Sequence, residues 1–306
     1  KTDFKGYSNH SYSATVVELF NANEQAAVKQ LNSGEQGIVI LDHTPFYAES
    51  GGQVGDAGLL QLDNGVFEVE DTIKLGNAFA HRGIARTDIG LNQRVKAEIN
   101  SERRAAIVKN HTATHLLHAA LRKVLGEHVT QKGSLCDSDK LRFDFSHFEA
   151  VTAQELHDVE QLVNDEIRRN HARETDLMPI EDAKEKGAMA LFGEKYGDVV
   201  RVIKFDDSVE FCGGTHVSAT GEIGLFKIIS EGAIAAGVRR VEAVTSKAAR
   251  VYMNEHVHTL DEVKQEVKNL KDPLGAIRQM KEENSKLKKQ LEKLVIKAEK
   301  SGMAGL

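Results

Sequence analysis

The sequence contains few of the residues that are typical of several common classes of protein. Its 306 residues include two cysteines, three prolines and no tryptophan. Two cysteines are too few for a disulfide framework, so we expect a reducing, cytoplasmic setting. No run of about 18 apolar residues and no signal-like leader is visible, which predicts a protein without a membrane span. The chain is 41% hydrophobic and 28% charged, which supplies enough apolar material for a folded protein of roughly two domains.

The charge balance gives no global basic field. There are 40 Lys and Arg against 46 Asp and Glu, so the formal net charge is −6 with histidine neutral. Any polyanionic partner must therefore be held by local patches. One local excess lies between residues 278 and 300, which hold eight Lys or Arg and four Glu. That stretch is as typical of a solvated helix face as of RNA contact.

The pattern of apolar residues changes twice along the chain. Residues 1–100 alternate short β-type runs with turn residues, which predicts a small β-barrel-like domain. Residues 101–246 combine the two-residue spacing of strands with the three- to four-residue spacing of helices, which predicts an α+β domain. Its helices are predicted from about 101 to 125, at 152–169 and at 180–190. Residues 247–306 carry apolar residues at 3-4-3 spacing, which predicts helices with a coiled-coil-like stripe. The predicted fold class is therefore α+β with a helical C-terminal extension.

A glycine-dense polar loop interrupts the first predicted domain at residues 47–56. Its Gly51 and Gly52 let the backbone approach a ligand closely, although a hairpin or bulge explains the same residues without a ligand. The loop lacks the Lys and Ser/Thr of a phosphate-binding P-loop and the spacing of a dinucleotide fingerprint. Neither nucleotide motif is supported.

Four residues offer the ligands of a metal site. His111 and His115 are four apart on the predicted long helix, which places their rings on one face. Cys212 and His216 flank a glycine pair after a predicted strand, so the backbone can fold until both side chains converge. One thiolate and three imidazoles form a tetrahedral zinc set. His118 is a further histidine of the same helix, better suited to support the site than to be a fifth ligand.

The role of such a zinc depends on whether its coordination is closed. Four protein ligands are typical of a structural site, whereas catalytic zinc keeps a position for water. The helix reads HTATH and lacks the Glu that follows the first His in zinc proteases, which argues against peptide hydrolysis. With one ligand loose, zinc could activate water for attack on an ester. A Cys212 nucleophile paired with a histidine is a third reading, but only zinc accounts for all four residues.

Seven blocks of the sequence together resemble the editing region of alanyl-tRNA synthetase, over about residues 3–246 and in the order of that family. They are DHTPFYAESGGQVGD at 42–56, HTATH at 111–115, QKGS at 131–134, RFDF at 142–145, GAMALFGEKY at 187–196, CGGTH at 212–216 and GVRRVE at 237–242. Free-standing alanyl-tRNA editing proteins share the metal motifs. The long block at 42–56 is closer to the synthetase.

The resemblance implies roles for individual residues. It assigns one Zn²⁺ per chain to His111, His115, Cys212 and His216 and hydrolytic editing to Gln131. It makes Gly51 and Gly52 part of the pocket wall and Asp144, Arg239 and Arg240 candidate substrate contacts. For Arg239 and Arg240 a salt bridge at a strand edge is an equal alternative, and for Asp144 a structural role. Cys136 has no motif and is expected to be a buried, incidental thiol.

The implied function is hydrolysis of serine or glycine from mischarged alanine tRNA, whose acceptor end would be the partner. The alternatives are a non-catalytic tRNA-binding or assembly module with a structural zinc, or a free-standing editing protein. Since the chain runs from Lys1 to Leu306 and shows no adenylate-forming motif, we expect a synthetase fragment that neither activates alanine nor consumes ATP. The apolar stripe of its last helices predicts pairing within one chain or in a homodimer.

Overall fold

The computed structural model describes residues 1–23, 26–189 and 197–303. By its contacts the chain divides into two compact units, residues 1–249 and 250–306. Most of the block at 187–196 lies outside the described residues. Across the described part, no helix is both long enough and apolar enough to cross a membrane. A division of the first unit at about residue 100 stays a prediction.

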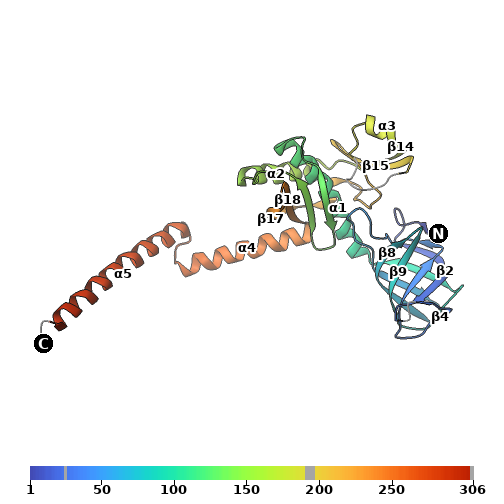
Figure 1. Ribbon diagram of the computed structural model, residues 1–306, viewed down its shortest axis with the longest axis horizontal. Helices are drawn as coiled ribbons and strands as arrows, with labels where there is room; N and C mark the ends of the chain where they lie inside the picture. The colour runs from blue at the N-terminus through green and yellow to red at the C-terminus, as the bar shows by residue number, and fades with distance from the viewer. Residues whose placement is uncertain (24–25, 190–196, 304–306) are drawn as a thin grey trace. The chain divides into compact units, whose positions relative to one another are not determined.

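A sheet that closes on itself forms the first part of the first unit (Figure 1). Strands β11, β7, β8, β9, β5 and β2 are neighbours in that order, and β11 also pairs with β2. Their bounds are β2 Ser11–Asn21, β5 Gln36–Leu41, β7 Gly58–Leu62, β8 Gly65–Leu75, β9 Ala78–Ala85 and β11 Arg94–Ile99. The short strand β3 (Ala26–Ala27) extends this sheet at β2. Two separate pairs of short strands accompany it: β1 (Asp3–Phe4) with β6 (His43–Thr44), and β4 (Gln30–Leu31) with β10 (Ile89–Gly90). The predicted barrel-like architecture is confirmed.

Alternating side chains fill the interior of this barrel. Leu19, Val39, Leu60 and Phe67 are almost fully buried in one cluster, each from a different strand. Because successive residues of a strand point to opposite faces, the residues between them face outward. The core therefore follows from the β-type runs that the sequence analysis identified.

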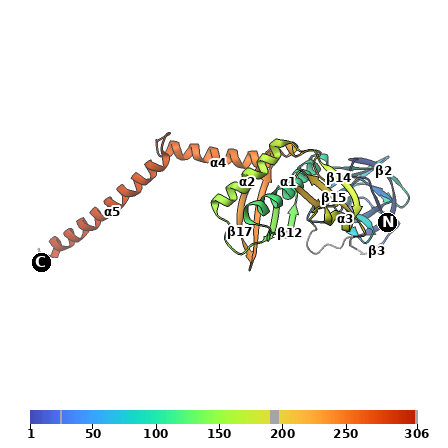
Figure 2. The ribbon, with the colours of Figure 1, turned by 90° about the horizontal axis from the view of Figure 1, so that it is seen from above.

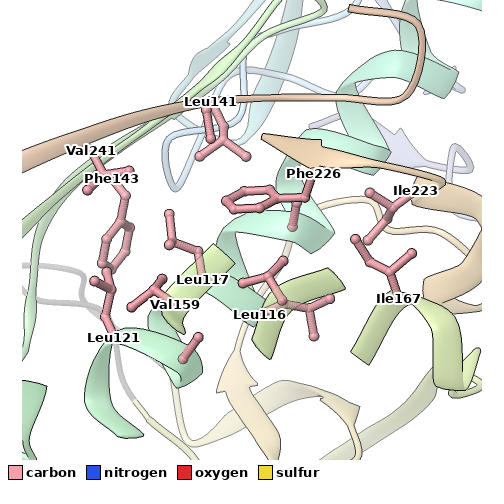
Figure 3. Close-up of a cluster of buried hydrophobic side chains, with 14 of the residues drawn as sticks. Leu116, Leu117, Leu121, Leu141, Phe143, Val159, Ile167, Ile223, Phe226 and Val241 are labelled. Carbon is pink, nitrogen blue, oxygen red and sulfur yellow. The ribbon is translucent and has the colours of Figure 1, made fainter. Parts of the chain in front are cut away.

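Two helices cover one face of a second sheet, in which β12 (Gln131–Cys136), β13 (Leu141–Ser146), β18 (Val238–Thr245) and β17 (Phe226–Ala235) lie in that order. Helix α1 (Ser101–Leu125) is capped at its start by Asn100, whose side chain accepts a hydrogen bond from the N–H of Arg103. Helix α2 (Ala153–Arg169) begins with a capping box of Thr152 and Glu155. The two helices lie side by side (Figure 2). Figure 3 shows Leu117 of α1, Val159 of α2 and Phe226 of β17 in the shared core.

A smaller sheet of three strands leads directly into Cys212 and His216, the second pair of candidate metal ligands. It consists of β14 (Glu174–Pro179), β15 (Val199–Phe205) and β16 (Ser208–Phe211), in that order. The helix predicted at 180–190 is wrong in length, because α3 spans only Ile180–Glu185. Gly187 has a φ of +77°, a left-handed conformation that ends a helix, and residue 190 lies outside the described part. A 3₁₀ turn, Thr220–Ile223, precedes β17.

A buried ion pair joins the barrel to helix α1. The guanidinium of Arg104 contacts both carboxylate oxygens of Asp56 and also donates to the carbonyl oxygens of Gly6 and Pro45. Arg104 is 3% exposed and Asp56 1%. Since every partner comes from the loops at one end of the barrel, this one side chain fixes that end to the helix that carries His111.

The second unit is helical. Helix α4 (Ser246–Glu266) follows β18 and α5 (Pro273–Met303) comes after it. The helices predicted from residue 247 onward are confirmed. Leu287, Leu291 and Leu294 form an exposed apolar stripe on α5 at the predicted spacing. Whether that stripe pairs with another helix stays a prediction.

Candidate metal centre

The four candidate ligands converge in the first unit. Helix α1 presents His111 and His115 one turn apart, and the loop after β16 presents Cys212 and His216. One ligand atom from each lies within 4.8 Å of every other, and all four residues are buried. The Cys212 sulfur is 3.4 Å from His111 Nε2 and 3.2 Å from His216 Nε2. The structure brings together the whole set that the sequence predicted.

Two of the imidazoles are oriented by a hydrogen bond from the opposite ring nitrogen. His111 Nδ1 lies 2.8 Å from the amide oxygen of Gln53. Because an amide oxygen only accepts, Nδ1 carries the proton and Nε2 keeps its lone pair toward Cys212. His216 Nδ1 lies 3.0 Å from the Thr112 hydroxyl, and its Nε2 lies 3.2 Å from the Cys212 sulfur.

The third imidazole is supported by a buried carboxylate. His115 Nε2 lies 3.4 Å from Glu210 Oε2, and the other oxygen of Glu210 lies 3.1 Å from His118 Nδ1. The remaining His115 nitrogen, Nδ1, is buried without a hydrogen-bond partner. Glu210 was missed in the sequence, where it is a single acidic residue on a strand. It links His118 to His115, and a supporting role of His118 at the metal site stays a prediction.

The electrostatics keep the histidines neutral. Burial, and then the neighbouring His115, lowers the pKa of His111 well below its ordinary 6.5. Burial likewise lowers the pKa of His115 and of His216. Burial raises the pKa of the Cys212 thiol to about 12, so a cation binding there must displace that proton.

These side chains fit zinc. Each imidazole has one nitrogen anchored and one directed inward or unpartnered, as metal-bound histidines have, and the set has one soft and three borderline ligands. Four protein ligands also suit a closed, structural site. However, His111 and Cys212 line a cavity of about 460 Å³, so the centre borders open space on that side. The identity of the metal stays a prediction.

The glycine loop forms a tight turn that reaches the centre. Ser50 and Gln53 pair across it, and Gly51 and Gly52 have φ of +59° and +82°. A Cβ on Gly52 would lie 2.1 Å from Ser134 Oγ, so only glycine fits there. Gly51 lines the cavity. Gln53, a residue of the loop that the sequence analysis did not single out, also accepts the N–H of Thr215 and so ties the loop to both halves of the metal motif.

The predicted catalytic residue, Gln131, lies at the start of β12. It is half-buried, and its amide nitrogen donates to Ser134 Oγ over 3.1 Å. Ser134 in turn packs against Gly52. The structure thus links Gln131 to the glycine turn through Ser134. Its hydrolytic role stays a prediction.

The three candidate substrate contacts lie in ion pairs on the four-stranded sheet. Arg240 donates to both oxygens of Asp144 at 2.7 and 2.8 Å, and Arg239 pairs with Glu231. Neighbouring β18 residues point to opposite faces, so the two arginines do not share one surface. Both fit the salt-bridge alternative, and contact with substrate stays a prediction. Cys136 is buried, as predicted, with its sulfur 3.2 Å from the Thr114 hydroxyl.

A second group of possible ligands is built differently. Glu166, His171 and Asp206 also bring their ligand atoms within 4.8 Å of one another, but they are half-buried or exposed. Arg169 pairs with Glu166 at 2.7 Å, so part of its charge is already compensated. This group has the features of a surface ion-pair cluster.

Two family descriptions match the chain. Residues 1–103 match "tRNA synthetases class II (A)", and residues 200–242 match "Threonyl and Alanyl tRNA synthetase second additional domain". The first covers the barrel, where the sequence showed no adenylate-forming motif. The second covers Glu210, Cys212, His216 and the two arginines.

Curated relatives extend over nearly the whole chain. The alanine–tRNA ligase of Colwellia psychrerythraea (strain 34H / ATCC BAA-681) is 70% identical over 299 residues, 95% of this chain and 34% of that protein. Those of Pseudoalteromonas translucida (strain TAC 125) and Pseudomonas syringae pv. syringae (strain B728a) are 56% and 54% identical, over 96% and 97% of this chain and again 34% of each ligase. The chain thus spans about a third of the length of these relatives. Over that span it belongs to the alanyl-tRNA synthetase family.

Proposed function

We propose that this chain removes serine or glycine from mischarged alanine tRNA, as the hydrolytic editing region of an alanyl-tRNA synthetase. The observation that carries the proposal is that two of the four candidate metal ligands, His111 and Cys212, line the 460 Å³ cavity. A purely structural site has no need of such an opening. The family membership supplies the substrate class, a tRNA.

A synthetase needs a hydrolytic site separate from its alanine pocket because serine and glycine are similar in size to alanine. A pocket built for alanine binds glycine only about 1–3 kcal/mol less well, and an added hydroxyl is also poorly rejected. A separate hydrolytic pocket corrects both errors. When bound, zinc would supply Lewis-acid activation of the ester or of water.

The chain's own residues then hold the reacting groups. Gln53 fixes the His111 tautomer, and Glu210 fixes His115. In this proposal Gln131 accepts the hydroxyl of a misattached serine, and Gly51 leaves room for the ester beside His111. Asp144, Arg239 and Arg240 would act from the sheet, by orienting the strand that carries Gln131 or by contacting the RNA.

A deacylation assay tests the proposal. The metal-loaded chain should hydrolyse serylated alanine tRNA faster than the alanylated form, and Cys212→Ser should abolish the difference. Cys136→Ala is the matched control, since its thiol is buried but lies outside the four ligands. Equal rates with both tRNAs, or none with either, would reject editing.

A non-catalytic tRNA-binding or assembly module is the second candidate, favoured by the completeness of the four-ligand set. It predicts that metal removal unfolds the first unit and that saturating Ser-tRNA gives no turnover. A Cys212 nucleophile is disfavoured, because its thiol has a pKa of about 12 and the adjacent histidines have lowered pKa values. Trapping an adduct on Cys212 would revive it.

The stripe of α5 supports a separate proposal of pairing between copies of the chain. Leu287, Leu291 and Leu294 are each more than 60% exposed, which is unusual for leucines at coiled-coil spacing. Sedimentation equilibrium should give a dimer that Leu291→Lys dissociates. A stable monomer for the unmodified chain would reject it.

A further inference from the structure

The cavity beside the metal centre is lined by two chemically different groups of residues. One group belongs to the metal motifs: His111, Cys212, Gly213 and Gly214. The other group consists of four aromatic residues: Phe4, Tyr7, Tyr47 and Phe79. A substrate that spans the cavity would therefore meet a metal site with one part and aromatic rings with another.

The aromatic rings form one cluster around Phe4. Its ring centroid lies 4.9 Å from that of Tyr7, 5.6 Å from that of Phe79 and 6.0 Å from that of Tyr47. Tyr47 is buried, but Phe4 and Phe79 are half-buried and Tyr7 is 48% exposed. Partly exposed rings that gather in a concave wall are typical of ligand sites.

Tyr7 is held to the metal-binding loop. Its hydroxyl donates to the carbonyl oxygen of Gly213 over 2.6 Å. The Arg201 guanidinium lies 4.1 Å from the centre of the Tyr7 ring, and its Nη1 donates to the carbonyl oxygens of Cys212 and Gly214 at 2.9 and 2.8 Å. The aromatic wall is thereby fixed relative to the metal ligands, as positioning of a single substrate requires.

A positive charge lies at the same cavity. Lys74, near the end of β8, lines it, is exposed, and donates to Ser50 Oγ over 3.0 Å. The bond to Ser50 holds the ammonium beside the glycine turn. One cavity thus offers a metal site, aromatic rings and a cation.

We propose that Phe4, Tyr7 and Phe79 form the subsite for the terminal nucleobase of the aminoacylated RNA, with Lys74 facing its phosphate. This inference rests on the proposed function and names the part of the substrate that these residues bind. Aromatic side chains are the common partners of unpaired RNA bases, and stacking tolerates different bases. The base anchors the nucleotide while the ester reaches the metal end.

Binding of small analogues tests the subsite. The probes are 3′-deoxy-3′-(L-serylamino)adenosine, whose amide resists hydrolysis, and the same compound with hydrogen in place of the base. Calorimetry on the metal-loaded full chain should show about 10-fold weaker binding without the base. In Tyr7→Ala and Phe79→Ala that ratio should fall toward one, whereas Tyr7→Phe keeps the ring and should keep the ratio.

Phe148→Ala is the matched control, since Phe148 is 88% exposed and lies outside the cavity lining. It should leave the ratio unchanged. A 5′-phosphate on the adenosine probe should strengthen binding several-fold in the unmodified chain but not in Lys74→Gln. Circular dichroism identifies any variant that fails to fold. If Tyr7→Ala does not fold, Tyr7→Ser takes its place.

The outcomes separate this subsite from the editing proposal. Equal binding of both probes by the unmodified chain, with faster deacylation of Ser-tRNA intact, overturns the subsite alone. Loss of the base effect in Phe148→Ala also overturns it. Absence of binding by both probes together with absence of deacylation overturns the editing function itself.

Discussion

The barrel and the α+β part bury histidine in opposite ways. In the barrel, His81 is fully buried, with Nδ1 2.8 Å from the Val39 carbonyl oxygen and Nε2 2.7 Å from the Thr44 hydroxyl. Both of its nitrogens are satisfied by neighbours. In the α+β part, His111, His115 and His216 each have one anchored nitrogen, and together with Cys212 they bring four possible ligand atoms within 4.8 Å of one another.

The difference is the one expected between a polar group that serves the fold and one that binds a metal ion. Buried polar atoms without partners cost stability, so a protein retains them only where something else uses them. The barrel should therefore be indifferent to metal, whereas the α+β part should gain stability from it. Three substitutions test this contrast, in decreasing order of expected effect.

The largest effect should come from the ion pair that joins the two regions. Arg104→Leu leaves the Asp56 carboxylate buried without its partner, which should cost about 3–5 kcal/mol of unfolding free energy. Urea denaturation measures it. Arg86→Leu breaks an exposed pair with Glu68 and should cost less than about 1 kcal/mol. Similar costs for both variants would mean that the Arg104–Asp56 ion pair contributes little to the free energy of unfolding.

Acid should weaken the barrel through His81. Burial lowers its pKa from 6.5 to about 4, so between those values the unfolded chain binds a proton that the folded chain does not. Stability should therefore fall as pH drops from about 6.5 to 4, by roughly 3 kcal/mol in total, and this loss should be complete below pH 4.

Denaturation at pH 7 and pH 4 in His81→Gln should show this loss reduced relative to the unmodified chain. Glutamine can still bond to Thr44 and Val39 but does not titrate in this range. His258→Gln, whose side chain is 75% exposed, is the control and should keep the full loss. An unchanged pH dependence in His81→Gln would show that the barrel histidine is not the acid-sensitive group.

Local sequence patterns sufficed to identify the four candidate metal ligands. His111 and His115 are one helical turn apart, and Cys212 and His216 flank two glycines, so each pair can be read from nearby residues alone. Helix α1 and most barrel strands were also visible in the periodicity, but β9 (Ala78–Ala85) was not. In contrast, closure of the barrel by pairing of β11 with β2 joins distant strands and leaves no local signal.

The supporting residues could not be predicted, because their roles arise only from long-range contacts. Gln53 meets His111 across 58 positions and Glu210 meets His118 across 92. The hairpin of β12 and β13 was seen only as motifs, since polar residues such as Gln131 and Ser134 break its apolar alternation. Gly187 ended α3 earlier than the apolar pattern suggested.

The smallest of the three effects should come from Glu210. It should concern metal binding by the α+β part and leave the barrel unaffected. Glu210→Gln preserves the shape but removes the charge that orients the Nε2–H of His115, so metal affinity should fall about 10- to 100-fold. Chelator competition measures it, with Glu174→Gln, an exposed residue paired with Lys204, as the control. Stability without metal should change less than stability with metal, because the carboxylate acts mainly through the ligand. If both fall equally, Glu210 supports the fold in the way that Thr44 supports His81, and the two regions bury histidine for the same reason.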